Sequence, residues 1–328
     1  MQEGEECMEE NEVNLIKGSD IEPKEVDWLW YPYIPYGKVT IVQGDPGEGK
    51  STFVLALAAL LTKGKPLPFT NEETEPINVI YQNTEDDAED TVIPRFINAG
   101  GDINRIFFID EKDKALSFSD DRIGRAIKKT GARVIIFDPL TSYIGSDISI
   151  NLANEVRTRF NYLIEVAKET KCAVIIVGHM NKMSGTKAIY RSLGSIDVIG
   201  SARSCLVIGT PEEDPETRVM AVQKCNLAEK GMAVSFSVHE GKVTWLEQIE
   251  MTADELLGSY VSGGNRITKL EKAKEVLLEM LSEGETPQQD IIATMKEYGI
   301  SKRTAENAKA ELGIKSVKNA NVWSWKLP

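Results

Sequence analysis

Short apolar runs recur along the central part of the chain and predict the strands of a buried sheet. The first five are continuous rather than alternating, which is typical of parallel strands covered on both faces. They are Val39–Val42, Ile77–Gln82, Arg105–Ile109, Arg133–Phe137 and Ala173–Gly178. Segments with helical periodicity lie between them, among them residues 151–170, where apolar residues fall on one stripe. This alternation predicts an α/β fold with a doubly wound, mainly parallel sheet.

The pattern changes after residue 203, where apolar runs are separated by turn signals such as Pro211–Pro215. These runs are typical of hairpin strands. They are Cys205–Gly209, Val219–Gln223, Val234–Val238 and Val243–Leu246. We expect them to extend the sheet as antiparallel strands at one edge.

A small helical module is predicted beyond the polar segment Ser259–Asn265. Thr268 with Glu271, and Thr286-Pro287 with Gln289, match capping boxes that open two helices. A third helix is expected from Ser301 to Leu312, and its spacing from the second is typical of a helix-turn-helix. Alternating tryptophans in Val317–Leu327 predict a hairpin wing. The chain thus divides into a flexible arm (1–27), a core domain (28–249), a linker (250–266) and a winged-helix-like domain (267–328).

Charge is distributed unevenly over a chain of net charge −13. Residues 1–27 hold ten acidic residues and two lysines, whereas residues 265–328 hold eleven basic and nine acidic residues. A nucleic-acid footprint would therefore have to be local. An apolar content of 41% without an 18-residue apolar stretch predicts a soluble protein with no membrane span. The four cysteines show no paired spacing, and the acidic N-terminus has no apolar signal region, so we expect a cytoplasmic location with reduced thiols.

The run from Gly44 to Ser51 matches the phosphate-binding pattern G-x-x-x-x-G-K-[ST]. An apolar strand leads into it and an apolar helix follows, so backbone N–H groups and the helix N-terminus can surround phosphate oxygens. Lys50 is expected to reach the β- and γ-phosphates, and Ser51 to ligate Mg²⁺. The predicted contacts to ATP are Gly44, Pro46, Gly47, Glu48, Gly49, Lys50, Ser51 and Thr52.

Carboxylates end two of the other predicted strands. Asp138 follows Val134–Phe137 and is expected to support Mg²⁺, because ligands bind at the carboxyl ends of parallel strands. Glu85 follows another strand and is the expected base that activates water, and Asp86 is the second candidate for that role. The alternative is that these acids merely stabilise a turn or the N-terminus of a helix.

Several basic groups follow in the chain. His179 closes the fifth strand, where it can sense the γ-phosphate or serve a structural role. The loop 181–191 contains three basic and no acidic residues, so it either grips a phosphate backbone or is simply solvated. Arg203 and Lys224 are candidates for cations that complete a neighbouring subunit's active site, or are ordinary surface charges.

Several segments in order resemble RecA-fold ATPases of the plasmid RepA replicative-helicase type. They are Trp28–Ser51, Thr84–Asp87, Phe137–Leu140, Gly178–Lys182, Arg191–Ser195, Gly200–Ser204 and Lys224–Ala228. The resemblance implies a hexameric ring around single-stranded DNA, with Glu85 as catalytic base and Arg203 as arginine finger. Lys224 matches a lysine of related ring helicases. We expect no primase-docking domain of the DnaB kind, and the chain has a C-terminal module that the small plasmid helicase lacks.

These observations predict a DNA-dependent ATPase of replication or recombination in a mobile element. The alternatives are a RadA/RecA-like recombination ATPase and a DNA-binding regulator that uses ATP as a switch. In the C-terminal module, Lys302, Arg303 and Lys309 lie on the third helix, which could enter a major groove. That module could equally bind protein.

Overall fold

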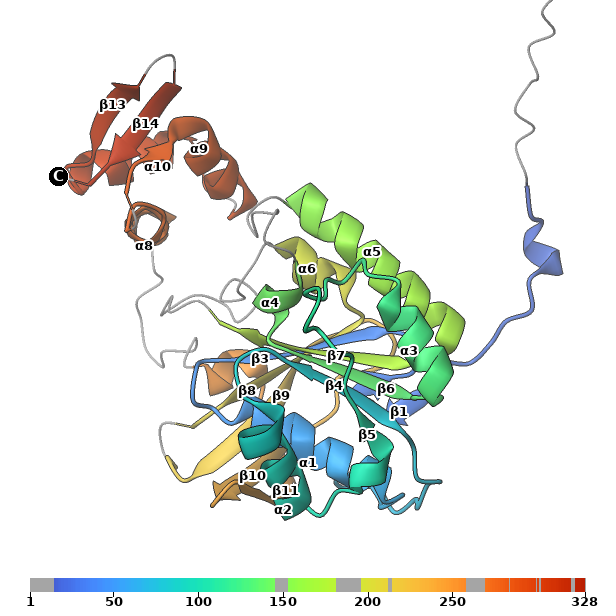
Figure 1. The fold of residues 1–328 in the computed structure, drawn as a ribbon. Coiled ribbons are helices and arrows are strands. Elements are labelled where there is room, and N and C mark those ends of the chain that lie inside the picture. The colour runs from blue at the N-terminus through green and yellow to red at the C-terminus, as the bar shows by residue number, and fades with distance from the viewer. Residues whose placement is uncertain are drawn as a thin grey trace, which may run out of the picture.

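A nine-stranded mixed sheet forms the centre of the protein (Figure 1). The computed structural model describes residues 15–144, 153–180, 196–211, 214–257, 269–282, 284–298, 300, 302–319 and 322–327. The sheet order is β11-β10-β9-β8-β3-β7-β6-β4-β5. Its strands are β3 (Val39–Gly44), β4 (Val79–Asn83), β5 (Ile106–Phe107), β6 (Val134–Asp138), β7 (Ala173–His179), β8 (Ser204–Gly209), β9 (Thr217–Cys225), β10 (Ala233–His239) and β11 (Lys242–Ile249).

The six strands from β8 to β5 are parallel, and β9, β10 and β11 add to β8 as antiparallel strands. The expected α/β fold, mainly parallel with an antiparallel edge, is therefore confirmed. The continuous apolar runs are explained by burial on both faces, because every residue of β3, β6 and β8 is buried.

Helices cover both faces of the sheet and create two cores (Figure 1). One core packs α1 and α2 against the sheet around Phe53 and Phe96, and the other packs α3 to α6 around Phe137 and Phe160. The helical segments of this domain are α1 (Lys50–Thr62), η2 (Ala88–Val92), α2 (Ile93–Asn98), η3 (Ile103–Arg105), α3 (Arg122–Thr130), α4 (Leu140–Ile144), α5 (Ala153–Thr170), α6 (Ile196–Ser201) and α7 (Ala253–Leu256).

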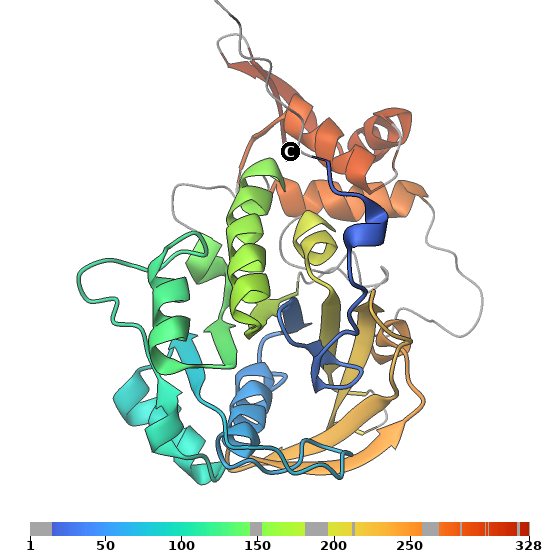
Figure 2. The same cartoon turned by 90° about the vertical axis from the view of Figure 1, so that its right-hand side faces the viewer.

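The antiparallel strands curve towards α1 and extend the first core (Figure 2). Phe53 of α1 lies 5.2 Å from Phe236 of β10 and 5.5 Å from Trp245 of β11, measured between ring centroids. Aromatic pairs at this separation add to the stabilisation from burial. The helix that follows the phosphate-binding run thus packs against both the parallel strands and the antiparallel strands β10 and β11.

The segment before β3 has two parts. Residues 15–25 are exposed and include η1 (Gly18–Asp20), and residues 1–14 of the expected arm lie outside the described residues. Residues 28–35 form a short antiparallel ribbon of β1 (Trp28–Trp30) and β2 (Ile34–Pro35). Trp30 is buried, and its indole nitrogen donates a hydrogen bond to the carbonyl of Pro68.

The C-terminal module contains the predicted three helices and hairpin. Its elements are α8 (Lys269–Met280), β12 (Thr286–Pro287), α9 (Gln288–Glu297), α10 (Lys302–Glu311), β13 (Lys315–Asn319) and β14 (Val322–Lys326). They enclose their own core, in which Leu277, Ile291 and Trp325 are buried. Of the predicted linker (250–266), residues 258–266 are outside the described part of the chain, as are the expected caps Thr268 and Ser301. Residues 250–257 are described and include α7, whose Ala253 and Leu256 are buried in a core shared with β9.

The expected capping box at Thr286 is wrong. Thr286 and Pro287 form β12, which pairs with Trp325 and Ser324 of β14. Because α9 begins only at Gln288, Thr286 is not the residue that caps it, and its hydroxyl donates instead to the carbonyl of Met280 at 2.8 Å. Pairing with the hairpin overrides the local signal.

Gly44, where β3 ends, cannot accept a side chain. A Cβ atom there would lie 2.2 Å from the backbone oxygen of Ile208 in the neighbouring strand β8. We expect Gly44→Ala to lower the free energy of unfolding by about 1–3 kcal/mol, measured by urea titration. Gly178→Ala in β7 is the matched control, since its Cβ would meet no atom closer than 4.0 Å. Equal stability of the two variants would contradict the close approach of β3 and β8.

Candidate nucleotide-binding site

The predicted site residues converge at the carboxyl ends of four adjacent strands. Gly44 of β3 lies level with His179 of β7, and Asn83 of β4 lies level with Asp138 of β6. A strand-order crossover separates β3 from β4, because β7 and β6 lie between them. Ligands of open α/β sheets bind beside such crossovers.

Two glycines let the loop between β3 and α1 turn tightly. Gly47 and Gly49 have φ values of +86° and +81°, which L-residues with side chains rarely adopt. The carbonyl of Gly49 then accepts the first helical hydrogen bond, from the backbone N–H of Phe53 at 2.8 Å. Pro46 is exposed in the loop, and Thr52 lies half-buried in the first turn of α1. The loop therefore ends at a free helix N-terminus, the arrangement that binds phosphate.

Lys50 is held beneath this loop. Its side chain is buried, and its Nζ donates to the carbonyl of Asp45 at 2.8 Å. Burial lowers the pKa of Lys50, and nearby carboxylates, first that of Asp138, oppose the shift. The ammonium group is thus partly desolvated, a state that a phosphate anion would relieve.

Asp138 and Ser51 form the predicted metal-binding pair. Burial raises the pKa of Asp138, while hydrogen bonds from Ser51 and from Tyr81 oppose the rise. The Tyr81 hydroxyl donates to Asp138 Oδ2 at 2.8 Å. Among the described residues no cluster of three or more His, Cys, Asp or Glu could hold a metal alone. One carboxylate beside one hydroxyl suits Mg²⁺ that arrives with nucleotide phosphates, since such ions keep few protein ligands.

Glu85 and His179 approach each other across the site. His179 Nε2 lies 3.8 Å from Glu85 Oε1, and the His179 Nδ1 atom is buried without a hydrogen-bond partner among the described residues. The side chain of Asn83 accepts the backbone N–H groups of Glu85 and Asp86, at 2.7 and 2.8 Å, which fixes the turn after β4. Asp86 instead pairs with Arg95 at 2.8 Å. Glu85, whose side chain is 60% exposed, is therefore the carboxylate left open to solvent.

Arg203 and Lys224 lie near the start of β8, at the opposite ends of the parallel strands from the predicted site. Arg203 directly precedes Ser204, which pairs with Thr40, four residues before Gly44 and hence ~13 Å along the strand. Arg203 is exposed. The structure does not bring it to the site formed by its own subunit.

Lys224 supports the end of α6 within its own chain. Its Nζ donates to the carbonyls of Ile199, Gly200 and Ala202 at 2.7, 3.2 and 3.0 Å. Burial lowers its pKa. A lysine that binds the last carbonyls of a helix is a common stabilising device.

Two supporting residues are not found by motif matching. Tyr81 holds Asp138, but lies within an apolar run where its hydroxyl gives no sequence signal. Thr210, just after β8, donates to Glu48 Oε2 at 2.5 Å and so fastens the loop to the antiparallel side of the sheet. The basic loop 181–191 lies outside the described residues.

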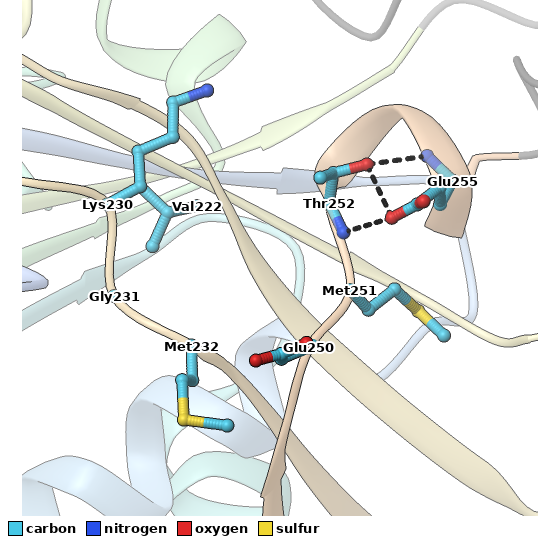
Figure 3. A pocket seen from close by; sticks show the side chains of 8 residues that line it. All are labelled: Val222, Lys230, Gly231, Met232, Glu250, Met251, Thr252 and Glu255. Carbon is cyan, nitrogen blue, oxygen red and sulfur yellow. Dashed lines mark hydrogen bonds between the residues drawn. The ribbon is translucent and has the colours of Figure 1, made fainter.

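A separate pocket of about 520 Å³ opens beside α7 (Figure 3). Its lining comes from β9, from residues 230–232 before β10, and from residues 250–255. A Cβ atom at Gly49 would lie 3.6 Å from Val238, at the other end of β10, so the pocket and the phosphate-binding loop lie at opposite ends of that strand. Figure 3 shows Thr252 and Glu255 of its wall joined in a capping box that opens α7. None of the predicted site residues lines it.

Known proteins share sequence or fold with this chain. The chain is 24% identical over 277 residues to the DNA repair protein RadA of Halalkalibacterium halodurans; the match covers 82% of this chain and 51% of the relative. The chain thus spans about half the length of that curated relative. A KaiC-like protein, PH0186, from Pyrococcus horikoshii shares 17% identity with a TM-score of 0.47, over 65% of this chain and 91% of that one. Each helix in the described part of the chain is too short or too polar to cross a bilayer.

A family model described as an AAA domain matches residues 5–185, more than half of the chain. The matched segment includes the loop of Gly44–Ser51, the carboxylates Glu85 and Asp138, and His179. Nucleotide binding by a P-loop fold is what this family and this geometry have in common. The chain therefore belongs to the AAA domain family.

Proposed function

We propose that this chain is a DNA-dependent ATPase that works as an oligomer. The observation that carries the proposal is the convergence of Lys50, Ser51, Asp138, Glu85 and His179 at one edge of the sheet. The similarity to a protein named for DNA repair supports DNA as the partner. The finer form of the proposal is a hexameric ring helicase of the RepA type, acting on single-stranded DNA in replication or recombination of a mobile element.

The chemistry follows from the position of each group. Lys50 neutralises charge on the β- and γ-phosphates, while Ser51 and Asp138 hold the Mg²⁺ that accompanies ATP. Glu85 accepts a proton from water as the water oxygen bonds to the γ-phosphorus, and the bond to the β-phosphate oxygen breaks to release ADP and phosphate. His179, beside Glu85, is placed to respond when the phosphate leaves.

Steady-state ATP turnover with and without single-stranded DNA tests this function. We expect turnover to require Mg²⁺ and to rise when oligothymidylate is added. Nucleotide binding without turnover, with or without DNA, would contradict the motor and favour the regulator that uses ATP as a switch.

The second candidate function is a recombination ATPase, which the similarity to RadA favours. The two differ in assembly, because a ring helicase closes around DNA and a recombinase forms a filament. Electron microscopy with ATP and single-stranded DNA separates them. Closed rings support the helicase, and helical filaments along the DNA support the recombinase.

Arg203 is expected to complete the site of a neighbouring subunit. It is exposed and precedes Ser204, which itself lies ~13 Å along the sheet from Gly44, so its own site is out of reach. We expect Arg203→Ala to lower turnover by about 10³-fold or more, while ATP still binds. Mixing Arg203→Ala with Lys50→Met then restores activity, because mixed neighbours form one intact interface. Mixtures that stay as inactive as either variant would contradict action between subunits.

A further inference from the structure

The C-terminal hairpin, β13 with β14, is the most basic exposed element of the C-terminal module. Residues 312–328 contain three lysines and no acidic residue, in a chain of net charge −13. The lysines are Lys315, Lys318 and Lys326, and each is exposed. In Figure 2 the hairpin extends beyond the helices of its module. Such a local excess of positive charge favours a polyanion.

Two of these lysines are placed where folding alone would not favour them. Lys315 and Lys326 lie directly opposite each other in the hairpin register. Like charges in that position destabilise a strand pair. A phosphate backbone close to the hairpin would remove this repulsion.

Trp323 adds an aromatic surface beside the lysines. Its side chain is 50% exposed, whereas Trp325, two residues on and on the same face of the strand, is 1% exposed and belongs to the module's core. Lys318 lies opposite Trp323, with its Nζ 5.5 Å from the centre of the ring. An exposed indole with a cation at its side suits a stacked base and the phosphate attached to it.

Helix α10 is less suited to bind DNA. Lys302 lies 3.9 Å from Glu306, and Glu311 forms an ion pair with Lys274 of α8. Lys309 points to the hairpin, where it contacts Ser316 and lies over the Trp325 ring at 4.5 Å. These carboxylates offset part of the positive charge that α10 could offer to phosphates.

We propose that the C-terminal hairpin binds single-stranded DNA, with an unpaired base stacked on Trp323 and phosphates held by Lys315, Lys318 and Lys326. The bases of a duplex are already stacked in pairs, so only an unpaired strand can offer a base face to the indole. This deepens the proposed function, because it names the form of DNA that the C-terminal module takes and the element that takes it.

Binding of fluorescent oligonucleotides to the full chain tests the proposal. Anisotropy is measured in EDTA without nucleotide, so that the phosphate-binding loop is empty, using a 20-nucleotide oligothymidylate and a blunt 20-base-pair duplex. We expect tighter binding of the single strand. Trp323→Ala should weaken it about tenfold, and Trp323→Phe should largely preserve it. Lys302→Gln on α10 is the matched control and should bind as the wild type does.

Salt dependence and crosslinking give two further readouts. Replacing Lys315, Lys318 and Lys326 together by Gln should reduce the slope of log affinity against log salt by about 2. Photocrosslinking to bromodeoxyuridine in the oligonucleotide should label the peptide that contains Trp323. An unchanged thermal midpoint shows that Trp323→Ala is folded, as its exposure predicts.

The contrary results are equally defined. Wild-type affinity of Trp323→Ala, or a preference for duplex that depends on Lys302, would overturn the hairpin proposal. Basal ATP turnover without DNA should not change in Trp323→Ala. If the wild type hydrolyses no ATP but the hairpin variants still lose DNA binding, the ATPase proposal fails and the hairpin proposal stands.

Discussion

Replacing Lys50 by Met is expected to abolish ATP turnover without weakening the fold of the nucleotide-free protein. In the proposed function, Lys50 supplies positive charge where negative charge develops on the phosphates, and loss of one such group typically costs about 10²–10³ in rate. In the absence of nucleotide, the same ammonium group is buried, and its pKa is lowered by that burial. The lowered pKa means that the folded protein disfavours the charged form of Lys50, so an uncharged side chain of similar length should not cost stability.

The measurement combines ATP turnover with thermal unfolding, and the unfolding midpoint is determined with and without Mg²⁺·ATP. In the wild type, ATP should raise the unfolding midpoint because it binds the native state. In Lys50→Met that rise should vanish, while the midpoint without ATP stays equal or higher. Lys63→Met, at the other end of α1, is the matched control, since Lys63 is 44% exposed and lies 4.0 Å from Asp102. A normal ATP-dependent rise in Lys50→Met would remove Lys50 from the phosphate site.

The parallel part of the sheet is predictable from sequence because both faces of its strands are buried. Burial on both faces requires apolar residues without alternation, and a run such as Val134–Phe137 satisfies that requirement with four consecutive apolar residues. The glycines of the phosphate loop are predictable for a different reason. Gly47 and Gly49 adopt positive φ values that few other residues tolerate, so the conformation selects the residue type.

The contacts that complete the site depend on register between distant segments, which local patterns do not encode. Tyr81 reaches Asp138 because β4 and β6 pair side by side in one particular alignment. Thr210 reaches Glu48 across 162 positions of sequence. The same reason explains β12, because the pairing of Thr286 with Trp325 is a long-range event that competes with a local capping signal.

Sequence spacing also leaves the roles of the basic residues open, and the structure separates them. Lys224 is engaged by three carbonyl oxygens of its own subunit, which the stabilising interpretation accounts for. Arg203, which lies near Lys224 just before β8, remains exposed. A role between subunits is therefore better supported for Arg203 than for Lys224, although both stay predictions.

Replacing Glu85 by Gln is expected to separate ATP binding from ATP hydrolysis. The amide keeps the size of the side chain and leaves the backbone turn after β4 unchanged. It cannot accept the proton of the attacking water. Loss of a general base typically costs about 10²–10⁴ in rate. Lys50, Ser51 and Asp138 are untouched by this change, so the rise in unfolding midpoint caused by Mg²⁺·ATP should persist.

Asp86→Asn is the control that makes this prediction specific to Glu85. Asp86 is the next residue, and Asn83 holds the backbone N–H groups of both, yet the Asp86 carboxylate is turned to Arg95 at 2.8 Å. This ion pair is largely exposed, so its loss should cost at most about 1 kcal/mol of stability and little turnover. If Asp86→Asn stops hydrolysis and Glu85→Gln does not, Asp86 is the base, and Arg95 must then release it when nucleotide binds. If both variants hydrolyse ATP normally, the water is activated from elsewhere and the end of β4 has no part in the chemical step.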